Sequence, residues 1–191
     1  HTALRRQRQM CIRDRSAAIS GSAIARGTSF LRDAMGTQIM SAGLNVIDEP
    51  HRRRGLRSAA FDVEGLSPET INLVQDGVLQ SWLLDSTTAR QLELESNARA
   101  ARGVGGPPSP SATNLYLAAG TQDVAGILDD VGEGFFVTEL IGMGVNGATG
   151  DYSRGASGFR LENGELTYPV SDVTIAGQRR RDACNYGTNS H

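Results

Sequence analysis

The sequence predicts an α+β fold that is rich in β-structure, with a mainly antiparallel sheet, hairpins and a few short helices. Two turn signals lead to this prediction, Asp76-Gly77 and Asn163-Gly164, each placed between apolar runs. Both dipeptides favour the type I′ turn of a two-residue hairpin, because its two central residues take positive φ. The length of 191 residues, with 39% hydrophobic residues and 23 glycines, fits one ordinary domain with a core of its own.

The first hairpin is expected over residues 71–82. Its turn at Asp76-Gly77 sets Val74 opposite Leu79 and Ile71 opposite Trp82. Both faces of this ribbon carry apolar side chains, so we expect it to be covered on both sides. Upstream, Leu44, Val46 and Ile47 predict a further strand that stops at residues 48–50.

The second hairpin is expected over residues 159–168. Alternation around Asn163-Gly164 puts four apolar residues on one face and polar residues on the other, the apolar set being Phe159, Leu161, Leu166 and Tyr168. Pro169 is expected to end the second strand at a sheet edge, since proline has no N–H for the ladder. Residues 170–175 can form another strand.

Three short helices complete the predicted set. Residues 29–36 can form one, with Ser29 as its cap and Gly36 at its end. Residues 86–94 can form another, capped by Ser86 or Thr87. Residues 121–131 show apolar positions at helical spacing, with Thr121 as the expected cap and Gly132 as the stop. The Gly- and Pro-rich stretch 103–111 is expected to be a loop.

Charge divides the chain into a body and two tails. Residues 1–15 hold five arginines and one aspartate, and residues 179–191 hold three arginines and one aspartate. We interpret both tails as artefacts of cloning or sequence assembly, and residues 16–178 as the domain. This body has 11 arginines against 19 acidic residues, a net charge of −8, so nucleic acid is not an expected partner. No apolar run is long enough for a membrane helix.

Motifs for catalysis are mostly missing from the body. It has no HExxH, no GxSxG and no Walker loop, and its one histidine is His51. Arg52–Arg54 beside it can be an anion site or, as we favour, a solvated loop. Asp62 and Glu64 would share a strand face, where they could bind a cation or remain an exposed pair. The glycines of 142–147 resemble a dinucleotide loop only superficially, because no βαβ setting surrounds them. We therefore expect neither a catalytic residue nor a metal ligand in this chain.

The strongest candidate site is the glycine-bounded stretch 149–158. Its polar residues Asp151, Tyr152, Ser153 and Arg154 stand among small residues that let a backbone or a ligand approach closely. We expect these four residues on a loop between two strands, facing a cleft or a partner subunit. Asp151 and Arg154 could hold a substrate, or they could form an ion pair at a tight strand crossing.

Several motifs in a fixed order carry a family resemblance. They are AISG and TSFL near the start of the body, then AAFDVEG, LVQDGVLQSWLLD, VTELIGMGVN, TGDYSRGASGF, LENGEL and TYPVSDVTIAG. Together they resemble the C-terminal part of the TldD/PmbA family, on its PmbA (TldE) side. Gln178 stands where the family pattern has Asn, Glu93 where it usually has Gly, and SNARAARG matches only loosely.

The resemblance implies a cytoplasmic zinc metalloprotease that works as a TldD–TldE pair on unfolded or modified peptides. In this family the HExxxH zinc motif belongs to the TldD-type subunit, so the resemblance implies a chain without zinc whose partner carries it. Whether the chain itself acts as an enzyme stays open, and the resemblance covers only a fragment of the family's full length.

Two alternatives differ in class. One is a self-sufficient homodimeric metallopeptidase with its HExxxH upstream of the fragment. The other is a non-enzymatic, gyrase-associated interaction module, which the acidic body disfavours for direct DNA contact.

Overall fold

The computed structural model describes residues 16–142 and 146–178, so both tails of the sequence lie outside the described part. The described elements are α2 (Gly21–Ala25), β1 (Val46–Asp48), β2 (Ile71–Gln75), β3 (Val78–Leu79), α3 (Ser86–Gln91), β4 (Ala100–Ala101), β5 (Ser109–Pro110), β6 (Leu115–Leu117), α4 (Val124–Val131), β7 (Gly134–Ile141), β8 (Asp151–Glu162) and β9 (Glu165–Gln178). Antiparallel strands dominate this set, and the helices are short, so the predicted fold class is confirmed. No helix of the described residues is long and apolar enough to cross a membrane.

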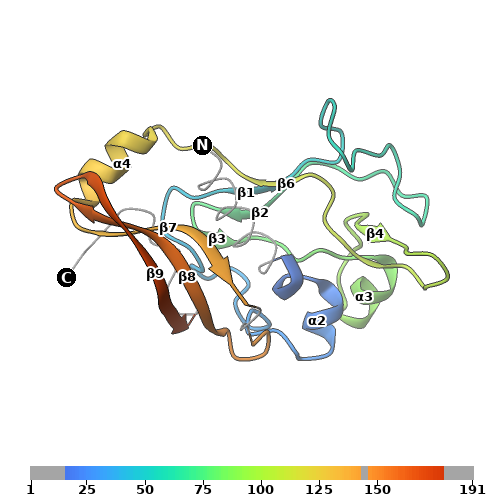
Figure 1. Ribbon diagram of the computed structural model, residues 1–191. Helices are drawn as coiled ribbons and strands as arrows, with labels where there is room; N and C mark the ends of the chain where they lie inside the picture. Colours follow the sequence, from blue (N-terminus) through green and yellow to red (C-terminus); the bar gives the residue numbers. More distant parts are fainter. Residues whose placement is uncertain (1–15, 143–145, 179–191) are drawn as a thin grey trace.

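Besides the two-stranded pair β4-β5, two larger sheets form opposite parts of the molecule (Figure 1). One has the strand order β3-β2-β1-β6, and the other has the order β7-β8-β9. The main core belongs to the first sheet, where Leu73 and Leu79 are fully buried and pack with Ile19, Phe30 and Leu31. Burial of such side chains is the main favourable term in folding.

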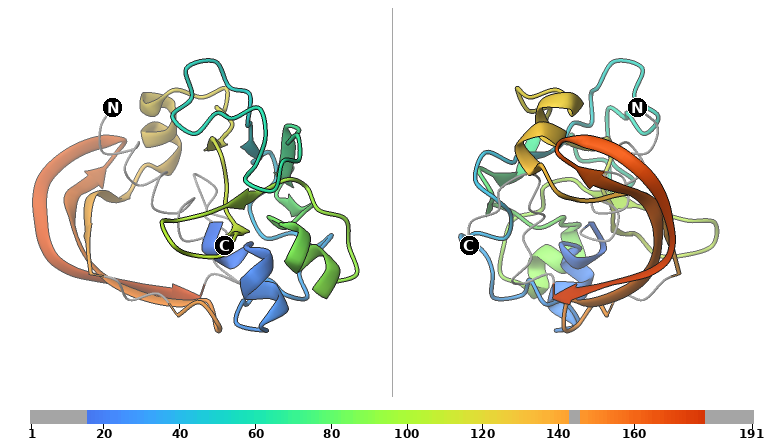
Figure 2. Two further views of the ribbon diagram at one scale, coloured as in Figure 1. Left: turned by 90° about the vertical axis from the view of Figure 1, so that its right-hand side faces the viewer. Right: turned by 60° about the vertical axis from the view of Figure 1, so that its left-hand side comes forward.

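The second sheet is a long, strongly curved ribbon (Figure 2). Its register shifts three times, between Val137 and Glu139 and at two places along β8. Each such irregularity bends the strand and increases its twist. Gly158 sits at one of them, with the Phe136 carbonyl so close that a side chain would clash. The curvature turns one face of the ribbon toward the rest of the molecule.

The first hairpin forms as predicted at its turn. Asp76 and Gly77 both have positive φ (49° and 78°), and Val74 pairs with Leu79. The predicted pairing of Ile71 with Trp82 is wrong, because β3 ends at Leu79, before Trp82; on the other side of β2, Ile71 pairs with Asp48 of β1. Beyond Gln80 the chain turns away to bond with residues 19–21, which a local hairpin pattern does not anticipate.

The second hairpin also has the predicted turn, with Asn163 and Gly164 at φ 51° and 81° and Leu161 opposite Leu166. Pro169 does not end the strand, however, because β9 continues through it to residue 178. Proline is tolerated there since β9 is an edge strand. A register shift places Phe159 opposite Pro169, so the simple four-residue apolar face does not form.

Aspartates cap these two helices in place of the predicted hydroxyl residues: α3 begins at Ser86 as predicted but ends at Gln91, and α4 begins at Val124, later than predicted. Asp85 caps α3 through a capping box with Thr88, and Asp123 caps α4 by accepting from the Gly126 N–H. Gly132 ends α4 at positive φ, as predicted.

The predicted helix over 29–36 is wrong, and the chain forms turns there instead. The Ser29 hydroxyl bonds to the Ala18 carbonyl and the Phe30 N–H to the Gly147 carbonyl. These contacts with distant segments replace the bonds that a local helix would make. Gly36 does have the positive φ expected of it, 72°.

Candidate functional site

The predicted site residues lie in a strand. Asp151–Arg154 are the first four residues of β8, and they pair with the end of β9 from Asp151 onward. The turn lies before these residues, not at them. Gly150 has the positive φ of a turn, 81°, and the backbone of Asn146 bonds to the backbones of both Gly150 and Asp151. The small residues that suggested a loop instead allow close packing in the ribbon, as the Gly158 position shows.

The strand geometry separates the four candidates into two pairs. Successive side chains of a strand point to opposite faces. Tyr152 and Arg154 share one face, where Arg154 is buried, whereas Asp151 and Ser153 are exposed on the other. An ion pair between Asp151 and Arg154 is therefore ruled out.

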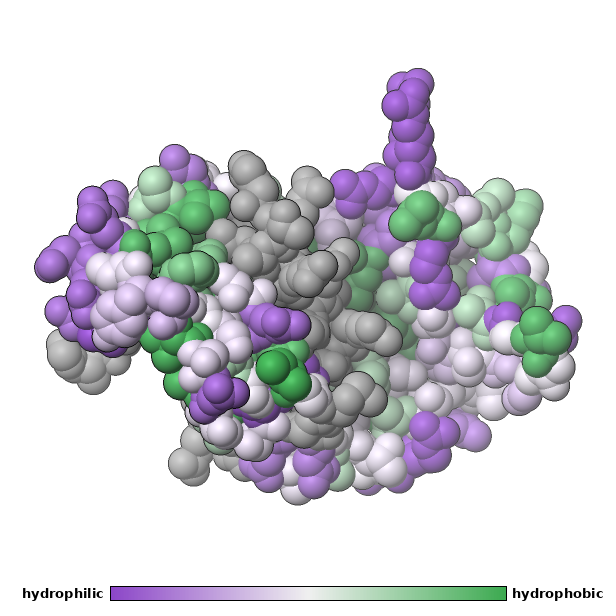
Figure 3. Space-filling view, viewed as in Figure 1, coloured by the Kyte–Doolittle hydropathy of each residue, from purple (hydrophilic) through white to green (hydrophobic). Residues whose placement is uncertain are grey.

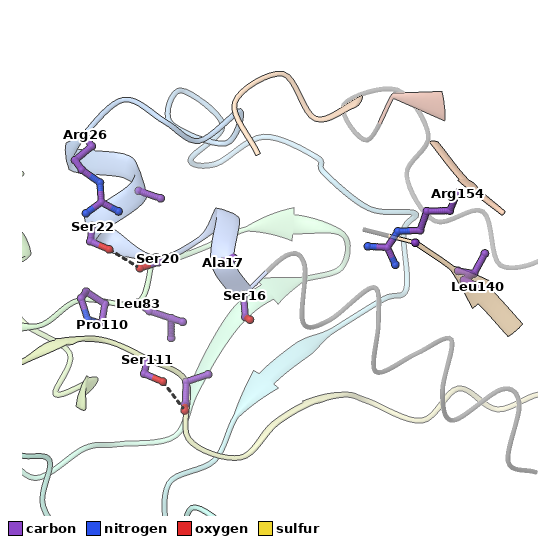
Figure 4. A pocket seen from close by; sticks show the side chains of 13 residues that line it. Ser16, Ala17, Ser20, Ser22, Arg26, Leu83, Pro110, Ser111, Leu140 and Arg154 are labelled. Atoms are coloured by element: carbon purple, nitrogen blue, oxygen red, sulfur yellow. Dashed lines mark hydrogen bonds between the residues drawn. The ribbon is translucent and has the colours of Figure 1, made fainter. Parts of the chain in front are cut away.

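Arg154 lines a pocket of about 690 Å³. Figure 4 shows its guanidinium directed into this space beside Leu140, with Ser20, Ser22 and Arg26 on the opposite wall. The whole set of described lining residues is Ser16, Ala17, Ser20, Ser22, Ala23, Arg26, Leu83, Pro110, Ser111, Ala112, Leu140, Gly142 and Arg154.

The chemistry of the lining favours a ligand that accepts hydrogen bonds. The described residues contribute two arginines and four serines but no carboxylate. Guanidinium and hydroxyl groups can donate to peptide carbonyls or to a carboxylate, and a charged donor makes the stronger bond. Apolar groups from Leu83, Pro110 and Leu140 supply the contact surface that such pockets need.

One wall of the pocket is held by a buried ion pair that sequence reasoning missed. Arg99 Nε donates to Asp48 Oδ2 at 2.5 Å, and both side chains are fully buried. The carboxylate also accepts from Thr113, while the rest of the guanidinium bonds to the carbonyls of Asn97 and Glu69. The Arg99 carbonyl accepts from the N–H of Ser111, a pocket residue. Asp48 and Arg99 are 51 residues apart, and no sequence pattern links them, so the sequence alone does not predict this pair.

Asp62 and Glu64 do not form the predicted shared face. They lie in a turn, not a strand, and each has its own partners. Asp62 accepts from the N–H groups of Glu64, Leu66 and Ala100, while Glu64 accepts from the N–H and hydroxyl of Ser86. Their carboxylates are thus used to fix a loop and the start of α3, and a joint cation site is not formed.

Arg52–Arg54 lie in an exposed loop, which agrees with the favoured prediction of a solvated loop. Arg52 stacks over the Tyr116 ring at 4.6 Å, and the Tyr116 hydroxyl donates to Glu49 at 3.2 Å. Burial and this bond to Glu49 raise the pKa of Tyr116, against the opposing charge of Arg52. Part of the glycine-rich stretch 142–147 lies outside the described residues.

The zinc implied by the family resemblance does not fit this part of the chain. Within residues 16–142 and 146–178, no three His, Cys, Asp or Glu side chains come together as a metal site. A protein zinc site needs three or four such ligands. No step of a zinc-dependent reaction can therefore be assigned to the described residues.

Comparison with known proteins places these observations in a family. Residues 14–182 match the model for the PmbA/TldA metallopeptidase C-terminal domain. Metalloprotease PmbA of Escherichia coli O157:H7 is 44% identical over 84% of this chain and 34% of its own length. The chain thus spans about a third of the relatives that it matches.

Solved structures agree with that assignment. A protein from Bacteroides thetaiotaomicron, solved as a candidate modulator of DNA gyrase, superposes with a TM-score of 0.79 at 28% identity, over 90% of this chain and 37% of its own. TldE from Thermococcus kodakarensis gives 0.77 at 22% identity, over 87% and 38%, which shows the same fold. The chain belongs to the PmbA/TldD metallopeptidase family and corresponds to its C-terminal domain.

Proposed function

We propose that residues 16–178 form the C-terminal domain of a PmbA/TldE-type subunit that does not itself bind zinc. It would pair in the cytoplasm with a TldD-like subunit that carries the zinc, and the pair would cleave unfolded or modified peptides. The single observation that supports this most is the 44% identity to a metalloprotease of the PmbA type. Zinc is assigned to the partner because the family resemblance gives the HExxxH motif to TldD-type chains.

The role proposed for this domain is to hold an extended peptide. β7 is an edge strand of the described ribbon, and Leu140 near its end lines the same pocket as Arg154. An extended peptide that adds to such an edge gains affinity from backbone bonds with little sequence choice. Arg154 would then donate to a peptide carbonyl or to the terminal carboxylate. Tyr152 would share that face, whereas Asp151 and Ser153, on the other face, would contact the partner subunit instead.

The test compares two arginines of the same strand. Arg154→Ala, in the full-length protein paired with its TldD-like subunit, is expected to lower peptide cleavage about tenfold to a hundredfold, the value of a hydrogen bond to a charged group. Its melting temperature should change little. Arg160→Ala is the matched control, because Arg160 is half-exposed and pairs with Glu133 and Glu162 away from the pocket.

Arg154→Lys should recover part of the activity, since it keeps the charge but loses the planar fork of donors. The opposite pattern would count against the assignment. If Arg154→Ala unfolds the subunit while the surviving complex stays fully active, Arg154 is a structural residue of the ribbon.

A further inference from the structure

One short segment, residues 97–99, joins two parts of the pocket wall that lies across from Arg154. Figure 4 shows Leu83, Pro110 and Ser111 together on this wall. Leu83 follows β3 and Ser111 follows β5, so the two stretches are far apart in the sequence. The positions of their side chains therefore depend on what holds the two stretches together.

The joining segment makes hydrogen bonds to both stretches. The Asn97 side chain accepts from the Leu84 N–H at 2.9 Å, and the Arg99 N–H donates to the Leu84 carbonyl at 3.1 Å. On its other side, the Arg99 carbonyl accepts from the Ser111 N–H at 2.8 Å. Leu84, which directly follows Leu83, and Ser111 are therefore held by the same segment.

Ala98, in the middle of the segment, has a backbone conformation that needs support. It is buried, and its φ is 56°, in the left-handed region that residues with a side chain rarely adopt. Such a conformation persists only where the surrounding contacts enforce it. The neighbouring Arg99 supplies charged donors for this purpose, with bonds to the carbonyls of Asn97 at 2.6 Å and Glu69 at 2.5 Å.

The ion pair between Arg99 and Asp48 anchors the segment in the interior. Strongly hydrophilic residues project from the face shown in Figure 3, whereas these two charged side chains are fully buried. Asp48 also accepts from the N–H and the hydroxyl of Thr113, two residues beyond Ser111. A buried ion pair adds little net stability, because the cost of removing two charges from water offsets their attraction. A fixed position for the two stretches of the wall accounts for the pair better than net stability does.

We propose that Asp48 and Arg99 are positioning residues, which hold Leu83 and Ser111 where an extended peptide binds. This inference rests on the proposed function, because it takes the pocket as the peptide site. The two charged residues act through the backbone of segment 97–99 and do not line the pocket themselves. Apolar replacement of both should leave the domain folded but let the wall shift, which weakens peptide binding.

The experiment measures KM and kcat for peptide cleavage by the full-length protein paired with its TldD-like subunit. Asp48→Leu/Arg99→Met is expected to raise KM about tenfold at unchanged kcat, the upper value of a neutral hydrogen bond. Partial unfolding has a different signature, because fewer active pairs lower the apparent kcat and leave KM unchanged. Asp123→Ala is the control for that signature, since it removes the cap of α4, which contributes none of the described lining residues.

Thr113 provides a milder test that does not depend on the folding of the double variant. Thr113→Val removes the hydroxyl donor to Asp48 but keeps the backbone N–H donor. KM should rise about twofold to fivefold, in line with the loss of one supporting hydrogen bond. Thr113→Ser keeps the hydroxyl and should restore the wild-type KM.

Circular dichroism checks that each variant is folded, and Arg154→Ala separates the two ways in which the test can fail. An unchanged KM in both wall variants, or a loss confined to the apparent kcat as in Asp123→Ala, overturns this inference alone if Arg154→Ala still lowers cleavage. If Arg154→Ala has no effect, the proposed function fails and this inference fails with it.

Discussion

Arg99→Met is expected to destabilise the chain severely. Asp48 accepts from Arg99 Nε at 2.5 Å and from the Thr113 N–H and hydroxyl at 2.9 and 3.0 Å, and neither charged side chain is exposed. Methionine keeps much of the volume of arginine but leaves the Asp48 charge buried without its counter-ion. Breaking a buried pair in this way costs about 3–5 kcal/mol, a large share of the roughly 5–15 kcal/mol that stabilises a domain.

The assay is urea unfolding of the 191-residue chain, followed by circular dichroism. Arg53→Met serves as the surface control, because Arg53 is exposed, and it should change the free energy of unfolding by less than about 0.5 kcal/mol. The double variant Arg99→Met/Asp48→Leu should cost less than the sum of its singles, since no isolated charge remains. A loss below about 1 kcal/mol for Arg99→Met, or strict additivity in the double variant, would refute the reasoning.

Three further predictions concern stability. Gly158→Ala should lower the free energy of unfolding in urea by about 1–3 kcal/mol, because the added methyl group would clash with the Phe136 carbonyl. Gly155→Ala is the control and should cost less, since a methyl group has room there. Equal losses for the two variants would contradict this prediction. Asp85→Ala should cost about 1–2 kcal/mol through loss of the α3 cap, and a negligible change would show that the cap is dispensable. The raised pKa of Tyr116 means that the unfolded chain loses this proton first, so stability present below about pH 10 falls as the pH rises beyond it. Tyr116→Phe should flatten that fall between pH 9 and 11 in thermal melts, and an unchanged slope would count against it.

Local signals in the sequence were enough for the turns and for the fold class. Asp76-Gly77 and Asn163-Gly164 have the positive φ that their turn type requires. Positions where distant segments decide the outcome were not predictable in this way. The 29–36 segment bonds to residues 18 and 147 instead of forming a helix, and β9 runs through Pro169 because it lies at an edge.

The candidate site was predictable as a stretch of sequence but not as a geometry. Small residues around Asp151–Arg154 indicated close packing, and the ribbon is closely packed there. They did not indicate how β8 aligns with its neighbouring strands, and therefore which side chains face the pocket. Only the pairing of β8 with β7 and β9 decides that Arg154 faces the pocket and Asp151 does not. The Asp48–Arg99 pair was missed because two ordinary residues far apart in sequence meet only in the fold.

The most direct test of the central claim is the zinc content of the full-length PmbA-type protein that contains these residues. It is measured by mass spectrometry of metals after purification alone, and again after assembly with the TldD-like subunit. We expect substoichiometric zinc and no peptide cleavage in the protein alone, and about one zinc per assembled pair together with chelator-sensitive cleavage. Stoichiometric zinc in the protein purified alone, with peptide cleavage by that sample, would contradict the account and favour a self-sufficient metallopeptidase.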